Sequence, residues 1–310
     1  MRKAFISTLT KLAEQDHRIM LLTGDLGFML LEPFIQKFPD RFINAGVAEQ
    51  NMIGIATGLA EAGMIPYVYS ITPFATLRPY EFIRNGPIYH KLQVRIVGAG
   101  GGFEYAHDGY SHYGIDDVGV LRVQPGISIF APADFQQAST IFQKTWDIQG
   151  PAYYRLGKDE VTIIPGLNGS FEISQAQVIG EGKDILFISL GSIANEVVNA
   201  ITDLASRGIQ CTLMIASSIN PPPKEMLAQL LPGFRHVITV EAHYVNGGLG
   251  SLVSEFIAEQ NYNCALVRCG VKFMPDGQSG SQNYLYQRHG ISSEALIKTS
   301  ILCIENSSSM

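Results

Sequence analysis

The 310-residue sequence lacks several features that define common classes of protein. It has no block of basic residues and carries a formal net charge of −6, so it offers no electrostatic surface for nucleic acid or anionic lipid. Its apolar runs are only as long as a strand, far short of a membrane span. The amphipathic N-terminal segment 1–15 differs from the apolar core of a signal peptide. We therefore expect binding to neither nucleic acid nor membrane.

Cysteine is scarce, and its spacing argues against both disulfides and a metal site. The four cysteines lie in apolar, strand-like contexts, with no CxxC pair and no accompanying histidine cluster: Cys211, Cys264, Cys269 and Cys303. His107 and His112 are five residues apart without a helical pattern, which does not suit zinc. The sequence predicts buried thiols in the reducing cytoplasm and no metal ligands in this chain.

What the sequence does contain is a regular alternation of strand-like and helix-like patterns. The strand-like runs are 19–23, 66–70, 94–97, 126–130 and 152–155, then 185–190, 210–215, 236–240 and 264–267. Helical patterns lie between them, for example at 46–63, 134–146, 193–207, 224–231 and 247–260. Strands separated by helices of this length predict an α/β protein with two doubly wound domains and mostly parallel sheets.

The alternation of strand-like and helix-like patterns is interrupted once, and this interruption predicts the domain boundary. Residues 161–182 hold turn-forming residues and no clear periodicity, as expected of a linker. We therefore expect one domain over 1–160 and a second over 183–310.

Two segments contain candidate functional residues. Glu49 lies near the start of an apolar helix. If Gly46 caps this helix, Glu49 is its third residue, and the helix dipole alone could explain a carboxylate there. Residues 103–117, FEYAHDGYSHYGIDD, follow a strand and a glycine run and hold several ionisable side chains. Ligands bind at the carboxyl ends of parallel strands in open α/β sheets, so both segments are expected to border one cleft.

Several motifs resemble one enzyme family, in the correct order along nearly the whole chain. AGVAEQNMIGIATGLAEAG (45–63), PFATLRPYEFIRN (73–85) and DGYSH (108–112) resemble the pyrimidine-binding domain of transketolases and 1-deoxyxylulose-5-phosphate synthases. ILFISLGSIANEVVNA (185–200) and VEAHYVNGGLGSLVSEF (240–256) resemble the C-terminal domain of the same family. The resemblance implies a thiamine-diphosphate-binding domain over 1–160 and a transketolase C-terminal domain over 183–310.

One part of the family pattern is missing. The family binds the diphosphate of thiamine diphosphate through a divalent metal, at a GDG motif followed by asparagines, and no GDG occurs here. The chain therefore resembles the C-terminal subunit of a split transketolase. The resemblance implies an N-terminal partner subunit that carries the diphosphate-binding domain and holds Mg²⁺ or Ca²⁺, with two copies of each subunit.

The resemblance also assigns roles to residues around the cofactor. Glu49 matches the glutamate that hydrogen-bonds N1′ of the aminopyrimidine and promotes formation of the C2 carbanion. Phe74 matches the aromatic residue that stacks on the pyrimidine, although a core phenylalanine would suit the same pattern. Asp25, in GDLG, matches a cofactor-proximal aspartate, although turn chemistry could also explain it.

Four further residues are implied to face the substrate, a sugar or sugar phosphate. His112 matches a substrate-binding histidine that can act as an acid or base, and Asp108 matches an aspartate that contacts a donor hydroxyl. Lys158 lies near the position of a phosphate-binding arginine, and Arg2 matches another. Glycines at 100–102 replace an earlier histidine of full-length transketolases, so the resemblance leaves the phosphorylation of the substrate open.

The expected activity is transfer of a two-carbon ketol unit from a ketose donor to an aldehyde acceptor. Alternatives are the beta subunit of a 2-oxo acid dehydrogenase, and acyl transfer from pyruvate as in 1-deoxyxylulose-phosphate synthase. A non-catalytic homologue that regulates a partner is a third alternative, which the retained Glu49 and His112 disfavour.

Overall fold

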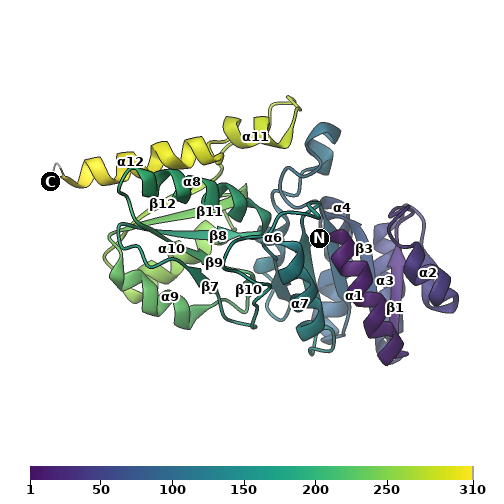
Figure 1. Ribbon diagram of the computed structural model, residues 1–310. Helices are drawn as coiled ribbons and strands as arrows, with labels where there is room; N and C mark the ends of the chain where they lie inside the picture. The colour runs from purple at the N-terminus through teal and green to yellow at the C-terminus, as the bar shows by residue number, and fades with distance from the viewer. Residues whose placement is uncertain (309–310) are drawn as a thin grey trace.

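The computed structural model describes residues 1–308 and contains two parallel-rich sheets that lie beside each other (Figure 1). The first sheet has the order β10 (Ser218–Asn220), β5 (Ser128–Phe130), β6 (Ala152–Leu156), β4 (Arg95–Ala99), β3 (Ile65–Ile71), β1 (Ile19–Thr23) and β2 (Phe42–Asn44). The second has the order β12 (Ala265–Val271), β11 (His236–Tyr244), β8 (Ile185–Leu190), β9 (Cys211–Ile215) and β7 (Gln177–Ile179). Only the edge strands β10 and β7 pair antiparallel in these sheets of residues 1–308. The predicted fold class is confirmed.

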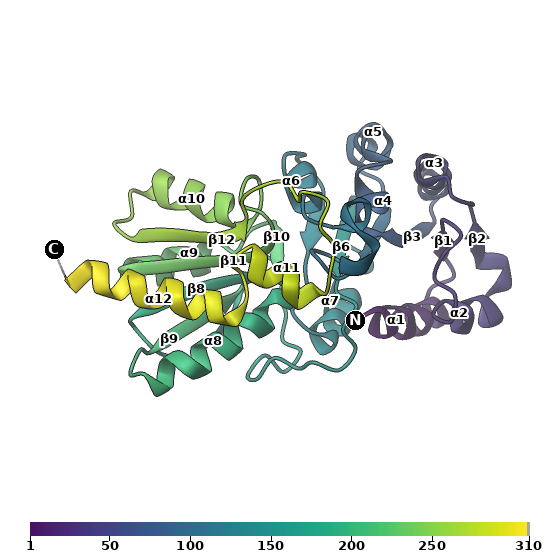
Figure 2. The same cartoon turned by 90° about the horizontal axis from the view of Figure 1, so that it is seen from above.

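Helices cover both faces of the first sheet, because alternate strand residues point to opposite sides. One face, with Leu21 and Tyr67, packs against α1 (Arg2–Gln15) and α7 (Phe135–Thr145). The other, with Leu22 and Val68, packs against α3 (Glu49–Glu61). Figure 2 shows α1 and α2 (Glu32–Lys37) on one side of this sheet and α3 and α5 (Tyr80–Ile83) on the other. The short helices α4 (Thr72–Thr76) and α6 (Asp117–Arg122) also pack in this domain.

The second sheet is covered in the same way. The helices on one face are α8 (Ala194–Ser206), α11 (Gln282–Arg288) and α12 (Ser293–Ser308). Those on the other are α9 (Lys224–Leu230) and α10 (Leu249–Gln260). No helix in residues 1–308 is both long enough and apolar enough to cross a membrane.

The cysteines lie in or near this second domain, and no disulfide joins them in the described structure. Cys211 and Cys269 are buried, as predicted. Cys264 and Cys303 are only partly buried, because they lie outside the strand interiors on the rim of the core. The prediction of buried thiols is therefore wrong for these two.

The two halves of the chain are joined by backbone pairing and by a buried arginine. β10 belongs to the second half in sequence but extends the first sheet by pairing with β5. Arg155 on β6 donates to the carbonyl oxygens of Gly114 (2.7 Å) and Ala242 (2.9 Å), and so touches both domains. Residues 161–182 include β7, which pairs with β9 of the second sheet. The division at 160 and 183 stays a prediction.

Candidate active site

Glu49 stands at the first position of α3, just beyond the carboxyl end of β2. The helix begins here because Ala48, with φ −144°, is its N-cap residue, two positions after Gly46. Gly46 therefore does not cap the helix, and Glu49 is its first residue and not its third. Glu49 is only 1% exposed. Its Oε2 accepts a hydrogen bond from Nη1 of Arg78 at 3.0 Å, while its Oε1 is buried without a hydrogen-bond partner among residues 1–308.

Arg78 and Phe74 form a stacked pair beside this carboxylate. The guanidinium carbon of Arg78 lies 4.1 Å from the centroid of the Phe74 ring, within range of a cation–π interaction. Phe74 lies on α4 and Arg78 four residues later, so the two side chains share one side of the segment. The sequence analysis missed Arg78. The signal that could have found it is this spacing within PFATLRPYEFIRN.

His112 meets Phe74 from a different loop. The two ring centroids are 5.0 Å apart with an interplanar angle of 69°, an edge-to-face contact. The hydroxyl of Ser111 lies 2.9 Å from Nδ1 of His112 and fixes the ring further. Glu49, Arg78, Phe74 and His112 therefore form a chain of contacts from α3, α4 and the loop after β4. That they border one cleft stays a prediction.

Tyr105 connects His112 to the two predicted phosphate ligands, and the sequence analysis missed it. Its ring centroid is 6.2 Å from that of His112 and 4.0 Å from Nζ of Lys158. Burial raises the pKa of Tyr105, and the charge of Arg2 opposes this effect, which places Arg2 close to the phenol. Arg2 also lies near Glu160, with 3.9 Å between Nε and Oε1. The two basic residues thus flank one aromatic ring.

The two predicted aspartates lie at the edges of this region. Asp25 adopts φ +58°, and its Oδ1 accepts from the side-chain amide of Asn44 at 2.9 Å. A Cβ on the neighbouring Gly24 would lie 3.7 Å from Oε1 of Glu49, so this turn borders the carboxylate. Asp108 ends a 3-10 turn, Ala106–Asp108, and is exposed on the loop that carries His112. The assigned roles of these seven residues stay predictions.

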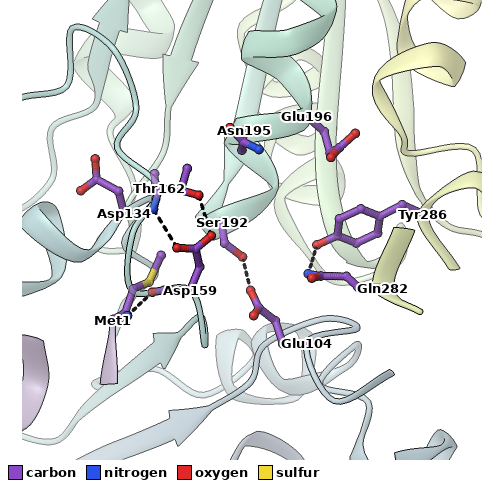
Figure 3. A pocket seen from close by; sticks show the side chains of 11 residues that line it. Met1, Glu104, Asp134, Asp159, Thr162, Ser192, Asn195, Glu196, Gln282 and Tyr286 are labelled. Atoms are coloured by element: carbon purple, nitrogen blue, oxygen red, sulfur yellow. Dashed lines mark hydrogen bonds between the residues drawn. The ribbon is translucent and has the colours of Figure 1, made fainter. Parts of the chain in front are cut away.

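A separate small cavity of about 100 Å³ lies between the domains (Figure 3). Several of its polar groups pair with one another: Ser192 donates to Glu104 Oε1 (2.7 Å), and Gln282 donates to the hydroxyl of Tyr286 (2.7 Å). Oδ2 of Asp134 accepts from the amide of Ile164 at 3.0 Å. Such mutual pairing suits an interdomain contact better than a ligand site.

Comparison with known proteins settles the family. Residues 1–162 match the transketolase pyrimidine-binding domain, and residues 174–296 match the transketolase C-terminal domain. The chain belongs to the transketolase family. The resemblance to the C-terminal subunit of a split transketolase is confirmed.

The relatives include separate subunits and halves of longer chains. A subunit of apulose-4-phosphate transketolase from Actinobacillus succinogenes is 34% identical over 86% of each chain. A 6-deoxy-6-sulfo-D-fructose transketolase subunit from a Clostridium species is 31% identical, over 96% of this chain and 92% of its own. The 1-deoxy-D-xylulose-5-phosphate synthase of Desulfitobacterium hafniense is 30% identical over 96% of this chain, which spans only 47% of that enzyme.

Solved structures agree with these matches. A structure described as a split-gene transketolase, inactive beta4 tetramer, superposes with a TM-score of 0.84 at 33% identity over 96% of both chains. Transketolase from Campylobacter jejuni gives a TM-score of 0.79 at 19% identity, over 97% of this chain and 46% of that one, which supports the fold.

Proposed function

We propose that this chain is the pyrimidine-binding subunit of a two-subunit, thiamine-diphosphate-dependent transketolase. The reaction is transfer of a two-carbon ketol unit from a ketose to an aldehyde. The observation that carries the proposal is the buried, unpaired Oε1 of Glu49, whose carboxylate is linked through Arg78 to the ring of Phe74, which in turn meets the imidazole of His112. The transketolase subunits among the relatives support the reaction class.

The residues present fit the pyrimidine end of the cofactor. A buried carboxylate oxygen without a partner costs free energy unless a bound group pairs with it, and a ring nitrogen of an aminopyrimidine is such a group. When bound, thiamine diphosphate supplies the carbanion chemistry. In this scheme Glu49 shares a proton with the ring nitrogen, Phe74 orients the ring by stacking, and His112 exchanges a proton with a donor oxygen.

A partner subunit supplies the remainder of the site in this proposal, because the sequence has no GDG motif for the metal and diphosphate. The exposed face of α3 suits such a partner: nothing lies within 4 Å of a Cβ built on Gly54 or Gly58. Large apolar side chains are also exposed in the same domain: Phe28, Met29, Val47, Phe82 and Tyr89. Exposed apolar groups of this size are typical of interfaces. We propose a cytoplasmic complex with two copies of each subunit.

Reconstitution tests the proposal. The purified chain, assayed with thiamine diphosphate and Mg²⁺, should show no ketol transfer. Adding the product of a neighbouring reading frame that encodes a GDG motif and downstream asparagines should restore it. Robust turnover by this chain alone would refute the split arrangement, and an inactive complex with every ketose tested would refute the transketolase activity.

Acyl transfer from pyruvate is the second candidate, because a 1-deoxyxylulose-phosphate synthase aligns with 96% of this chain. Two basic residues, Arg2 and Lys158, lie on either side of Tyr105 near the proposed cleft. Their positive charges suit a phosphate group, so they support a phosphorylated sugar as substrate for either reaction. Single-turnover assays separate the two, because release of CO₂ from pyruvate identifies acyl transfer and cleavage of a ketose identifies ketol transfer.

A further inference from the structure

We propose that Arg78 is a positioning residue that orients the Glu49 carboxylate, so that Oε1 is the oxygen presented to a bound aminopyrimidine. This inference rests on the proposed function and extends it to a residue outside the sequence-based assignment. It starts from a difference between the two oxygens of one side chain. Oε2 is bonded to Arg78, and Oε1 is buried without a partner in the described structure.

The bond to Arg78 restricts rotation of the carboxylate. Arg78 Nη1 holds Oε2 at 3.0 Å, a charge-assisted bond that is stronger than a bond between neutral groups. Gly24 borders Oε1 without a side chain, since a Cβ built there would lie only 3.7 Å from this oxygen. The carboxylate therefore keeps one oxygen, Oε1, available to a ligand.

Arg78 is itself held in place. Its guanidinium carbon lies 4.1 Å from the Phe74 centroid, so the planar group stacks on the ring while it donates to Glu49. The Arg78 side chain is 44% exposed, whereas that of Glu49 is 2% exposed. One residue therefore couples the carboxylate and the aromatic ring assigned to the cofactor.

The polarity of the contact suits the proposed function. Because Arg78 already donates to Oε2, Oε1 is the oxygen left to accept a hydrogen bond from a bound group. A ring nitrogen of an aminopyrimidine that carries a proton is such a donor.

The test compares four variants of this chain in the reconstituted complex. Arg78→Met and Arg78→Gln remove the charge, Arg78→Lys keeps it without the planar fork, and Arg84→Met is the matched control. Arg84 is an exposed arginine six residues away, and its Nη1 donates to Oδ1 of the Asn85 side chain at 3.4 Å. Thermal melting of each variant and light scattering of each complex verify folding and assembly.

Two measurements follow: the dissociation constant of thiamine diphosphate with Mg²⁺, and the near-ultraviolet circular dichroism of the bound aminopyrimidine. We expect Arg78→Met and Arg78→Gln to weaken binding by about tenfold, as for a lost charge-assisted hydrogen bond, and to change the dichroism band that reports the ring's protonation state. Arg78→Lys should recover most of both signals, and Arg84→Met should match the wild type.

Each other outcome overturns the inference in a recognisable way. Tighter binding by Arg78→Met would mean that the guanidinium competes with the cofactor ring. Wild-type binding and dichroism in both neutral variants would mean that Arg78 has no role at the carboxylate. If the wild-type complex binds no thiamine diphosphate, the proposed function itself fails and the inference falls with it.

Discussion

At the scale of single residues, Glu49 has both a structural and a catalytic explanation. As the first residue of α3 it lies at the positive end of the helix dipole, and it also pairs with Arg78. Either contact would retain a carboxylate at this position without any chemistry. The buried, unpaired Oε1 is the feature that a purely structural role leaves unexplained.

Replacement of Glu49 by Gln separates these explanations. Glutamine keeps the shape of the side chain but cannot hold a negative charge, so we expect turnover of the reconstituted enzyme to be nearly abolished while the fold is retained. Steady-state rates measure the turnover, and thermal melting of the same preparation measures the stability of the fold. If turnover survives and stability falls by only about 0.3–1 kcal/mol, the contribution of Glu49 is that of a charge at a helix start.

His112→Ala should impair cleavage of the donor more than binding of the cofactor. His112 and Phe74 meet in a T-shaped contact and not in a parallel stack, so we expect loss of His112 to leave the Phe74 ring in place. Loss of an acid–base group typically lowers a rate by about 10²- to 10⁴-fold. Single-turnover donor cleavage and thiamine diphosphate titration provide the comparison. An equal loss of donor cleavage and of thiamine diphosphate binding would show that His112 orders the pocket. Unchanged donor cleavage would place His112 outside the site.

The sequence predicted part of this site. Glu49, Phe74 and His112 lie in motifs whose order along the chain resembles a known family, and the structure brings the three together. Arg78 and Tyr105 were missed because their importance lies in contacts to residues from other loops. Burial of one carboxylate oxygen without a partner is likewise a property of the folded state, which no spacing of residues encodes.

At the scale of elements, the strand β8 coincides with its apolar run, 185–190, because a fully buried parallel strand has an unbroken hydrophobic pattern. Gly46 does not mark the start of α3, because a turn in which the Ala48 amide donates to the Gly46 carbonyl separates this glycine from the helix. β10 has only three residues, Ser218–Asn220, too few to show a period.

The start of α10 contains a buried carboxylate that should make stability depend on pH. Glu241 on β11 accepts from the amides of Leu249 (2.7 Å) and Gly250 (2.8 Å) at the first turn of the helix. Burial raises the pKa of Glu241 from 4.5 to about 7. A raised folded-state pKa means that the native protein binds the proton more tightly than the unfolded chain. The resulting contribution of Glu241 to the free energy of unfolding is fully present below about pH 4.5 and is lost as the pH rises through about 7.

Comparison with Glu241→Gln isolates this effect. The glutamine side chain has one hydrogen-bond acceptor fewer at every pH. It cannot bind or release a proton in this range, so its contribution to stability does not change with pH. Relative to the wild type, its free energy of unfolding should therefore rise by roughly 1–3 kcal/mol between about pH 5 and about pH 8. Urea unfolding at both pH values measures the difference. Burial lowers the pKa of the nearby His243, which acts in the opposite direction, so the wild-type profile alone would be ambiguous. A constant gap between variant and wild type would contradict the assignment.

At the scale of the whole molecule, the buried Arg155 joins the domains. Within the first domain, its Nε lies 2.9 Å from Oδ2 of Asp117, and the hydroxyl of Tyr153 donates to the same oxygen at 2.6 Å. The guanidinium also donates to carbonyl oxygens of both halves, at Gly114 and Ala242. The sequence analysis did not identify the contact between domains, because Arg155 and Ala242 lie 87 residues apart.

Arg155→Met should lower the free energy of unfolding by about 3–5 kcal/mol, because it leaves the Asp117 carboxylate buried without its cation. Denaturant unfolding measures this loss. The double variant Arg155→Met/Asp117→Asn should recover part of it, since the uncompensated charge is gone. Equal stability of the wild type and the single variant would show that the carbonyl contacts of Arg155 contribute little to the fold.

The strand β10 has a consequence for how the chain tolerates cleavage. By pairing with β5, it gives the first sheet a final strand supplied from residues 218–220, far beyond the linker. A fragment that stops at the linker would leave the hydrogen-bonding groups of β5 bare along the sheet's outer edge. Such open edges recruit strands from other molecules. The first half, released on its own, should therefore be prone to aggregation, and its solubility depends on a segment that belongs in sequence to its neighbour.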